Sequence, residues 1–376
     1  MKHEWKRIAA DVLNASSRQH PADAVLREKL KVVPGLSADD ARAISQAVFA
    51  AFRWHGWLDT VEPLTRLERA VEMAKVYAAR PQCIADEELG TRAVPPWTTA
   101  HMAVSPAWLR AIQHEPHLWL RARAGQGTAL ARTLGESRAS LVPALADAVK
   151  YCGVEDLFRS HEFHAGEFEI QDIASQAIAL VAAPKPGQTW WDACAGSGGK
   201  TLHLSDLMHN QGLIWASDRA PWRLDQLKRR AARAGCFNYR AARWDGSTHL
   251  PTRTRFDGVL VDAPCSGLGT WQRNPHARWT TAPGDVCELA AVQLRLLTHA
   301  ARAVKPGGRL VYAVCTLTRE ETEDVTAAFG AAHPAFAPWP HLHPWRPTQA
   351  PSSNHEFWPQ DTGGGGMFVA QWRREG

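Results

Sequence analysis

The sequence predicts an α/β protein whose carboxyl-terminal part is a doubly wound parallel sheet. Over residues 171–376, apolar runs of strand length alternate with helical patterns, which is typical of parallel strands joined by crossover helices. Helical spacing dominates residues 1–100, and a mixed pattern follows over residues 101–170. The proline-rich stretch Ala93-Val-Pro-Pro-Trp97 marks a boundary between these two parts. We therefore expect an all-helical domain, a small α+β module and a larger α/β domain, in that order.

The composition excludes several classes of protein. The apolar and charged fractions are those of a globular chain, and the net charge over 376 residues is only +5. The seven cysteines are scattered without a CxxC pair, so neither a structural zinc site nor a disulfide framework is expected. The first twenty residues carry charges throughout, and no run reaches the length of a transmembrane helix. We expect a cytoplasmic protein with no metal and no membrane partner, and we favour a monomer.

The amino-terminal region repeats its apolar residues at helical spacing from Trp5 to about Tyr77. Ser37 follows Pro34-Gly35 and precedes two acids, so it is expected to cap a helix. No catalytic constellation is evident in this region.

The middle module mixes both periodicities. Residues 118–123 and 166–170 are predicted to be short strands, and residues 128–134 and 141–149 are predicted to be helical. Small α+β modules of this kind often bind single-stranded RNA on a sheet face. The alternative is a packing spacer between the two larger domains.

The α/β domain is expected to begin with a helix capped by Asp172 and running to about Ala182. Five parallel strands and one final antiparallel strand are then predicted, at residues 189–193, 213–217, 239–244, 258–261, 309–314 and 367–372.

A glycine-rich loop follows the first of these strands and opens a helix. Such a loop lets the main chain approach a nucleotide-like ligand closely. A Walker A motif would need a glycine five residues before Gly199-Lys200-Thr201, and Cys194 stands there instead. Phosphate binding is therefore disfavoured.

Acids at successive strand ends point to an adenosine ligand. Asp218 ends the second strand about 20 residues after the loop, where a doubly wound fold places an acid on a ribose. The alternative is a cap for the helix after Pro221. Asp245, after the third strand, can contact an adenine amino group by the same geometry. With Lys200 as the one basic residue beside the loop, this set favours S-adenosylmethionine.

The fourth strand, residues 258–261, delivers an acid and a thiol at its carboxyl end. Asp262-Ala-Pro-Cys265 leaves the sheet at Pro264, because proline cannot continue the ladder. The fifth strand ends in Cys315. Since the two strands are neighbours in a doubly wound order, both cysteines should face one crevice.

A basic cluster lies between Arg219 and Arg243, where eight basic residues stand against the single acid Asp225. Such a cluster can follow a phosphate backbone, and the alternative is a solvated helix face.

Three motifs carry a specific resemblance: Asp192–Thr201, Asp262-Ala-Pro-Cys265-Ser-Gly-Leu-Gly269 and Tyr312–Thr316, with Gln171–Gln176 ahead of them. In this order they resemble the RsmB/Sun family of S-adenosylmethionine-dependent RNA 5-methylcytosine methyltransferases, over residues 105–376. The segment Leu36–Asp59 resembles the NusB-like helical domain that precedes some RNA methyltransferases. The resemblance implies a Rossmann-like methyltransferase sheet over residues 171–376, preceded by an RRM-like module and a NusB-like domain.

The resemblance also implies roles. Cys315 is implied to be the nucleophile that adds to cytosine C6, and Cys265 to assist product release. Asp262 is expected to bind the cytosine edge, because attack at C6 is easier when an acid bonds N3. Lys200 is implied to lie near the donor or the base, where it can favour the Cys315 thiolate. Donor contacts are expected from Cys194, Ala195, Gly196, Ser197, Gly198, Gly199, Lys200, Asp218, Arg223, Asp245 and Asp262.

Some positions depart from the family pattern. Gly196-Ser197 replaces the usual Ala-Pro of the first loop, and Glu321-Thr322-Glu323 replaces Glu-Asn-Glu. The expected partner is RNA, either rRNA or tRNA, with the target base unpaired or flipped. Two alternatives remain open at this stage: methylation of a protein or small molecule by the same fold, and a non-catalytic RNA-binding assembly factor.

Overall fold

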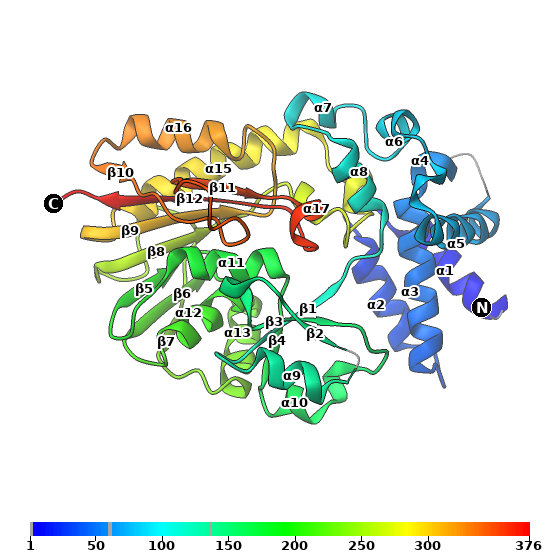
Figure 1. The fold of residues 1–376 in the computed structure, drawn as a ribbon, viewed down its shortest axis with the longest axis horizontal. Coiled ribbons are helices and arrows are strands. Elements are labelled where there is room, and N and C mark those ends of the chain that lie inside the picture. The colour runs from blue at the N-terminus through cyan, green and yellow to red at the C-terminus, as the bar shows by residue number, and fades with distance from the viewer. Residues whose placement is uncertain (1–2, 59–61, 136) are drawn as a thin grey trace. The chain divides into compact units, whose positions relative to one another are not determined.

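The computed structural model describes residues 3–58, 62–135 and 137–376 (Figure 1). Two compact units divide the chain. The first holds the chain up to Pro116 together with Gly267–Asp285, and the second holds His117–Ser266 together with Val286–Gly376. Asp59, the last residue of the segment that resembles a NusB-like domain, lies outside the described residues.

The first unit is helical, as predicted. Its amino-terminal helices are α1 (His3–Ala15), α2 (Ala22–Lys31), α3 (Ala38–Arg53), α4 (His55–Leu58), α5 (Pro63–Ala79), α6 (Asp86–Arg92), α7 (Thr98–His101) and α8 (Pro106–Gln113), with a 3-10 turn at Pro81–Cys83. The predicted cap is confirmed, because the Ser37 hydroxyl accepts a hydrogen bond from the main-chain N–H of Asp40. Helix α3 buries Ile44, Val48 and Phe52, whose spacing matches one helical face.

The stretch Gly267–Asp285 belongs to this helical unit, although it follows the fourth strand of the large sheet in sequence. It contains a 3-10 turn (Leu268–Thr270) and α14 (Ala277–Thr280). Arg278 is fully buried there and donates to the carbonyls of Ala93 and Ile112 and to Oε1 of Gln113, at 2.7–2.9 Å. A buried guanidinium needs several acceptors, so these bonds hold the stretch in the helical unit.

The second unit begins with a four-stranded antiparallel sheet in the order β2-β3-β1-β4. The strands are β1 (Leu118–Ala122), β2 (Arg138–Ala139), β3 (Ala148–Tyr151) and β4 (Phe168–Ile170). They are joined by α9 (Gly127–Thr133), α10 (His161–His164) and 3-10 turns at Pro143–Leu145 and Leu157–Arg159.

The predicted helix over residues 141–149 is wrong. Pro143 starts a 3-10 turn there, and Ala148 opens strand β3. The short apolar run alone is compatible with a helix or a strand. Pairing with β1 determines that it is a strand, because Val149 is buried opposite Leu120.

The large sheet has the order β10-β12-β9-β8-β5-β6-β7, with β11 paired to β12. Its strands are β5 (Thr189–Asp192), β6 (Leu213–Asp218), β7 (Tyr239–Arg243), β8 (Phe256–Asp262), β9 (Val304–Val314), β10 (Phe336–Pro338), β11 (Asn354–Phe357) and β12 (Met367–Arg374). Strands β5 to β9 are parallel, and β12 pairs antiparallel with β9, as predicted. The short strands β10 and β11 were not predicted.

Helices cover both faces of this sheet (Figure 1). They are α11 (Ile173–Ala182), α12 (Gly199–Leu207), α13 (Pro221–Arg233), α15 (Pro283–Ala301), α16 (Glu323–Ala332) and the short α17 (Pro359–Thr362). In β8, Val259 and Val261 pack with Leu297 of α15, whereas Leu260 packs on the other face with Ile178 of α11. Burial on both faces is what the continuous apolar run of β8 indicates.

No helix among the residues that the structure describes is both long enough and apolar enough to cross a bilayer.

Candidate active site

The candidate site lies at the carboxyl ends of β5, β6, β8 and β9. The strand order reverses between β5 and β8, since β5 leads outward to β6 and β7 while β8 leads to β9. In open α/β sheets ligands bind at this switch point, beyond the strand ends.

The loop from β5 to α12 is shaped by two glycines with positive φ. Gly196 has φ +54° and Gly198 has φ +93°, conformations that glycine adopts without the cost of a Cβ. A Cβ at Gly198 would lie 2.7 Å from Cγ of Leu227, whereas a Cβ at Gly196 would enter open space. The loop therefore packs tightly on α13 at one end and stays open at the other, beside Gly196.

Asp218 supports the open end of this loop. Its buried carboxylate accepts hydrogen bonds from the main-chain N–H of Gly196, at 3.0 Å, and of Ala220, at 2.8 Å. Arg223 lies at 3.8 Å from the same carboxylate. Ala220, the N-cap of helix α13, makes no side-chain cap bond. Asp218 therefore orders both the turn before α13, through Ala220, and the loop from β5 to α12, through Gly196. An open main-chain loop beside an ordered acid and an arginine fits the adenosyl group of S-adenosylmethionine.

Asp192 ends β5 beneath this loop and is fully buried. Its Oδ2 accepts a hydrogen bond from the Thr201 hydroxyl at 2.7 Å. Burial raises the pKa of Asp192 to about 7, and the charges of Asp262 and Asp218 act in the same direction. The sequence motif contained Asp192, but its position in the core could not be deduced from the motif.

Three further residues expected to contact the donor are Cys194 and Ser197 of this loop and Asp245 after β7. Cys194 is half-buried, and burial together with the charge of Asp192 raises the pKa of its thiol well above the ordinary value. Ser197 accepts hydrogen bonds from Arg230, at its carbonyl and its hydroxyl. Asp245 is exposed two residues after β7 and accepts from the N–H of Ser247 at 2.9 Å.

Lys200 and Asp262 form an ion pair across the switch point. Lys200 Nζ, in the first turn of α12, lies 2.6 Å from Oδ2 of Asp262 at the end of β8. The lysine is almost fully buried and Asp262 is partly exposed. Through this ion pair Lys200 fixes the orientation of the Asp262 carboxylate.

The two cysteines predicted to face each other from adjacent strand ends lie together in the structure. The Sγ atoms of Cys265 and Cys315 lie 3.2 Å apart, within reach of an S–H···S hydrogen bond, and neither cysteine is in a disulfide. Strands β8 and β9 are parallel neighbours with Asp262 opposite Ala313, so both chains leave the sheet at the same level. The hydrogen bond with Cys315, then burial, raises the pKa of the Cys265 thiol well above its ordinary value.

A buried carboxylate to which the sequence assigned no role lies beside these thiols. Glu321, in the turn before α16, accepts hydrogen bonds from the N–H and hydroxyl of Ser266, from Nε2 of Gln293 and from the hydroxyl of Thr318. The sequence matched Glu321 and Glu323 to a family motif, but nothing in it indicated that Glu321 is the buried one.

The basic cluster between Arg219 and Arg243 divides into two parts. Arg230 and Arg233 bind the buried carboxylate of Glu169 in β4, at 2.9 and 2.5 Å, and so join α13 to the small sheet. The other six basic side chains are exposed: Arg219, Arg223, Lys228, Arg229, Arg240 and Arg243.

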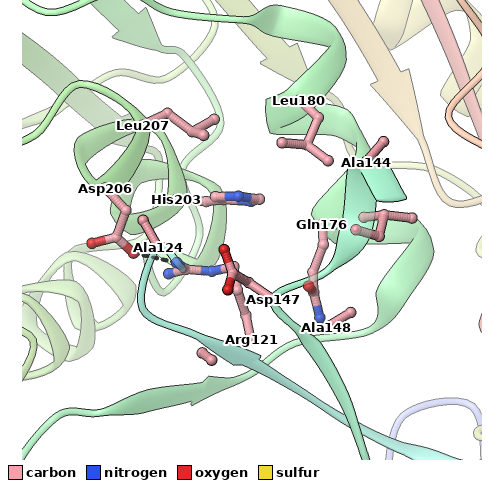
Figure 2. Close-up of a pocket in the computed structure, with 12 residues that line it drawn as sticks. Arg121, Ala124, Ala144, Asp147, Ala148, Gln176, Leu180, His203, Asp206 and Leu207 are labelled. Carbon is pink, nitrogen blue, oxygen red and sulfur yellow. Dashed lines mark hydrogen bonds and ion pairs between the residues drawn. The ribbon is translucent and has the colours of Figure 1, made fainter. Parts of the chain in front are cut away.

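A separate cavity of about 60 Å³ lies between the small sheet and α11 and α12. Figure 2 shows Arg121, Gln176 and His203 around it, with Arg121 paired to Asp206. Sites for drug-sized ligands are several times larger, so this cavity fits ordered water and is not the donor site.

Comparison with known proteins agrees with this geometry. The profile of the family described as 16S rRNA methyltransferase RsmB/F matches residues 179–373. The probable ribosomal RNA small subunit methyltransferase B of Bacillus subtilis is 36% identical over 58% of this chain and 50% of its own length. The ribosomal RNA small subunit methyltransferase B of Thermus thermophilus is 39% identical over 49% of this chain and 45% of its own length. The chain thus spans about half the length of these relatives.

Solved structures share the fold. The crystal structure of PH0851 aligns over 100% of this chain and 99% of its own, with a TM-score of 0.79 at 22% identity. A methyltransferase homologue from Pyrococcus horikoshii aligns over 72% of this chain and 90% of its own, with a TM-score of 0.58 at 25% identity. These similarities confirm the predicted helical region, small α+β module and Rossmann-like sheet. The family match confirms the resemblance and S-adenosylmethionine as the expected cofactor, and the chain therefore belongs to the RsmB/F family of 16S rRNA methyltransferases.

Proposed function

We propose that this protein transfers a methyl group from S-adenosylmethionine to C5 of a cytosine in RNA, with rRNA as the substrate class. The observation that carries the proposal is the pair of thiols, 3.2 Å apart at neighbouring strand ends, beside the Lys200–Asp262 ion pair. Cytosine C5 is a poor nucleophile until a thiolate adds at C6, so a cysteine beside a methyl-donor site suits this target.

Cys315 is the proposed nucleophile. Its sulfur forms a bond to C6, and the C5=C6 electron pair moves to C5, which then takes the methyl group. Asp262 bonds the N3 edge of the base and stabilises the proton that N3 takes from solvent as the thiolate adds and returns on release, while Lys200 holds the carboxylate in place. When bound, S-adenosylmethionine supplies the methyl group and leaves as S-adenosylhomocysteine.

Product release reverses the first step. The C5 proton leaves to solvent, its electron pair re-forms the C5=C6 bond, and the S–C6 bond breaks to return Cys315 as a thiolate. Cys265 assists this step, because its S–H donates a hydrogen bond to the departing sulfur 3.2 Å away.

The donor is proposed to lie along the loop from Cys194 to Lys200, with its ribose toward Asp218 and Arg223 and its adenine toward Asp245. The open space beside Gly196 supports this placement. Because Asp245 is exposed after β7, its contact depends on donor binding.

The exposed basic residues of α13 and its flanking loops are the proposed contact for RNA phosphates. Trp222 is 57% exposed, and the Arg223 guanidinium lies 5.3 Å from its ring centroid. An exposed aromatic ring beside cationic groups suits stacking of an unpaired base. Reading RNA in this way is consistent with a base that must leave its helix before reaching the thiols.

The experiment is to incubate the full chain with methyl-labelled S-adenosylmethionine and unmodified small-subunit rRNA or tRNA, and then digest the RNA to nucleosides. We expect label in 5-methylcytidine from rRNA, and none with Cys315→Ala. Label in tRNA alone would show that the substrate is tRNA and not rRNA. Label in another nucleoside, or in protein, would overturn the proposed reaction.

A further inference from the structure

Glu321 is a fully buried carboxylate to which the reaction above assigns no role. Its Oε1 accepts from the N–H of Ser266 at 2.9 Å and from Nε2 of Gln293 at 2.8 Å. Its Oε2 accepts from the hydroxyls of Ser266 and Thr318, the latter at 2.9 Å. Four donors to one carboxylate fill all of its acceptor sites.

These donors come from both cysteine-bearing loops. Ser266 directly follows Cys265, and Thr318 lies three residues after Cys315. Gln293 of α15 also bonds the carbonyl of Pro264, the residue before Cys265, at 2.9 Å. Burying a charge is costly even when it is fully bonded, and a neutral side chain could link the same loops. The charge therefore calls for a role besides linkage.

We propose that Glu321 is a positioning residue that determines which thiol acts as the nucleophile: its buried negative charge beside the Cys265 loop keeps the shared proton on Cys265 and leaves Cys315 as the thiolate. The inference deepens the proposed function and rests on it. It concerns the location of one proton between two sulfurs that lie 3.2 Å apart.

The groups around the two sulfurs agree with this assignment. The pKa of Cys265 is raised by its hydrogen bond with Cys315, by burial, and by the charges of Cys315 and Glu321. Tyr312 donates its hydroxyl proton to Gln293 and to the Glu321 carbonyl, and burial keeps its pKa well above the ordinary value. Lys200, in the first turn of α12, and Asp262, at the end of β8, are paired with each other. Of the carboxylates named here, Glu321 is the one that accepts a hydrogen bond from the main chain directly after Cys265.

This arrangement would serve both halves of the reaction. During attack, the Cys265 S–H donates to the Cys315 thiolate until the sulfur electron pair forms the bond to C6. During release, the same S–H stabilises the returning thiolate. The proton stays on Cys265 throughout, so no further acid or base is needed between the two sulfurs.

The test is alkylation of the full chain with limiting iodoacetamide from pH 6 to 9, with Cys265 and Cys315 quantified by peptide mass spectrometry. We expect Cys315 to react faster than Cys265 in the wild type. In Glu321→Gln the ratio of their rates should fall about tenfold, which corresponds to one unit of relative pKa. A wild type that reacts first at Cys265, or a Glu321→Gln chain with the wild-type ratio, would overturn the proposal.

Two variants separate charge from structure. Glu323→Gln removes an exposed carboxylate two residues away and should keep the wild-type ratio. Ser266→Ala removes one donor and leaves the Glu321 charge less neutralised, so the preference for Cys315 should hold or increase. If Glu321→Gln does not fold, a loss of preference in Ser266→Ala contradicts the proposal. Alkylation needs neither RNA nor donor, so its outcome is independent of whether the chain methylates RNA.

Discussion

Lys200 Nζ lies 2.6 Å from Oδ2 of Asp262, and this ion pair joins the first turn of α12 to the end of strand β8, three residues before Cys265. A second pair, Lys305 with Asp257 at 2.7 Å, lies near the opposite end of the same strand. Strand β8 therefore has one lysine–aspartate pair at the proposed reaction centre and a matched one remote from it.

These pairs allow a controlled prediction. Asp262→Asn should lower kcat by about 10²–10⁴-fold, because the neutral asparagine cannot stabilise a proton on N3 of the attacked base. Asp257→Asn should leave kcat unchanged and lower only the stability of the fold. The measurement is methyl transfer at saturating donor and RNA. Equal effects of the two substitutions on kcat would show that Asp262 contributes to the stability of the fold and not to the chemical step.

Cys265→Ala should accumulate a covalent complex between protein and RNA, because Cys315 can attack but its departure is no longer assisted. The complex should appear as a slower band on a denaturing gel after incubation with donor and RNA. Cys265→Ala/Cys315→Ala should form no such band. A band that persists in the double variant would place the covalent bond elsewhere.

Asp192→Asn should stabilise the protein more at pH 8 than at pH 5. The folded protein raises the pKa of Asp192 to about 7 from an unfolded value near 4, so the folded state binds the extra proton between these values. Stability from this group is present at low pH and is lost as the pH rises to about 7. The expected gain at pH 8 is on the order of a few kcal/mol, measured by urea denaturation.

The matched control for that prediction is Asp225→Asn, which changes an exposed aspartate on α13. Its effect on the free energy of unfolding should be small and nearly independent of pH. If Asp192→Asn shows the same flat profile, the carboxyl is ionised at neutral pH in the folded protein.

Glu169→Ala should destabilise the second unit by about 2 kcal/mol or more, because it leaves Arg230 and Arg233 without their buried partner. Glu167→Ala, two residues earlier and exposed, is the control. Thermal unfolding of both variants provides the comparison. A melting temperature of Glu169→Ala equal to that of the control would mean that the contact between the small sheet and α13 has little energetic weight.

The sequence predicted the elements whose signals are local. Strand β8 was evident from an apolar run ending at Pro264, and the cap at Ser37 from the acids that follow it. The adjacency of Cys265 and Cys315 followed from strand order, because parallel neighbours place their carboxyl ends together.

Features that depend on tertiary partners could not be predicted. Glu321 is buried because Ser266, Gln293 and Thr318 converge on it from three places in the chain. Arg278 is buried in the helical unit for the same kind of reason, with acceptors far away in sequence. Arg230 belonged to a cluster that suggested phosphate binding, yet it is engaged by Glu169, which lies 61 residues earlier.

The most direct test of the account uses RNA in which cytidine is replaced by 5-fluorocytidine, incubated with the wild-type chain and S-adenosylmethionine. Fluorine at C5 cannot leave as a proton does, so the covalent bond to C6 should persist after methyl transfer. Peptide mass spectrometry of the trapped complex should place the nucleotide on Cys315. A nucleotide attached to Cys265, or no trapped complex from an RNA that is methylated when unsubstituted, would contradict the account.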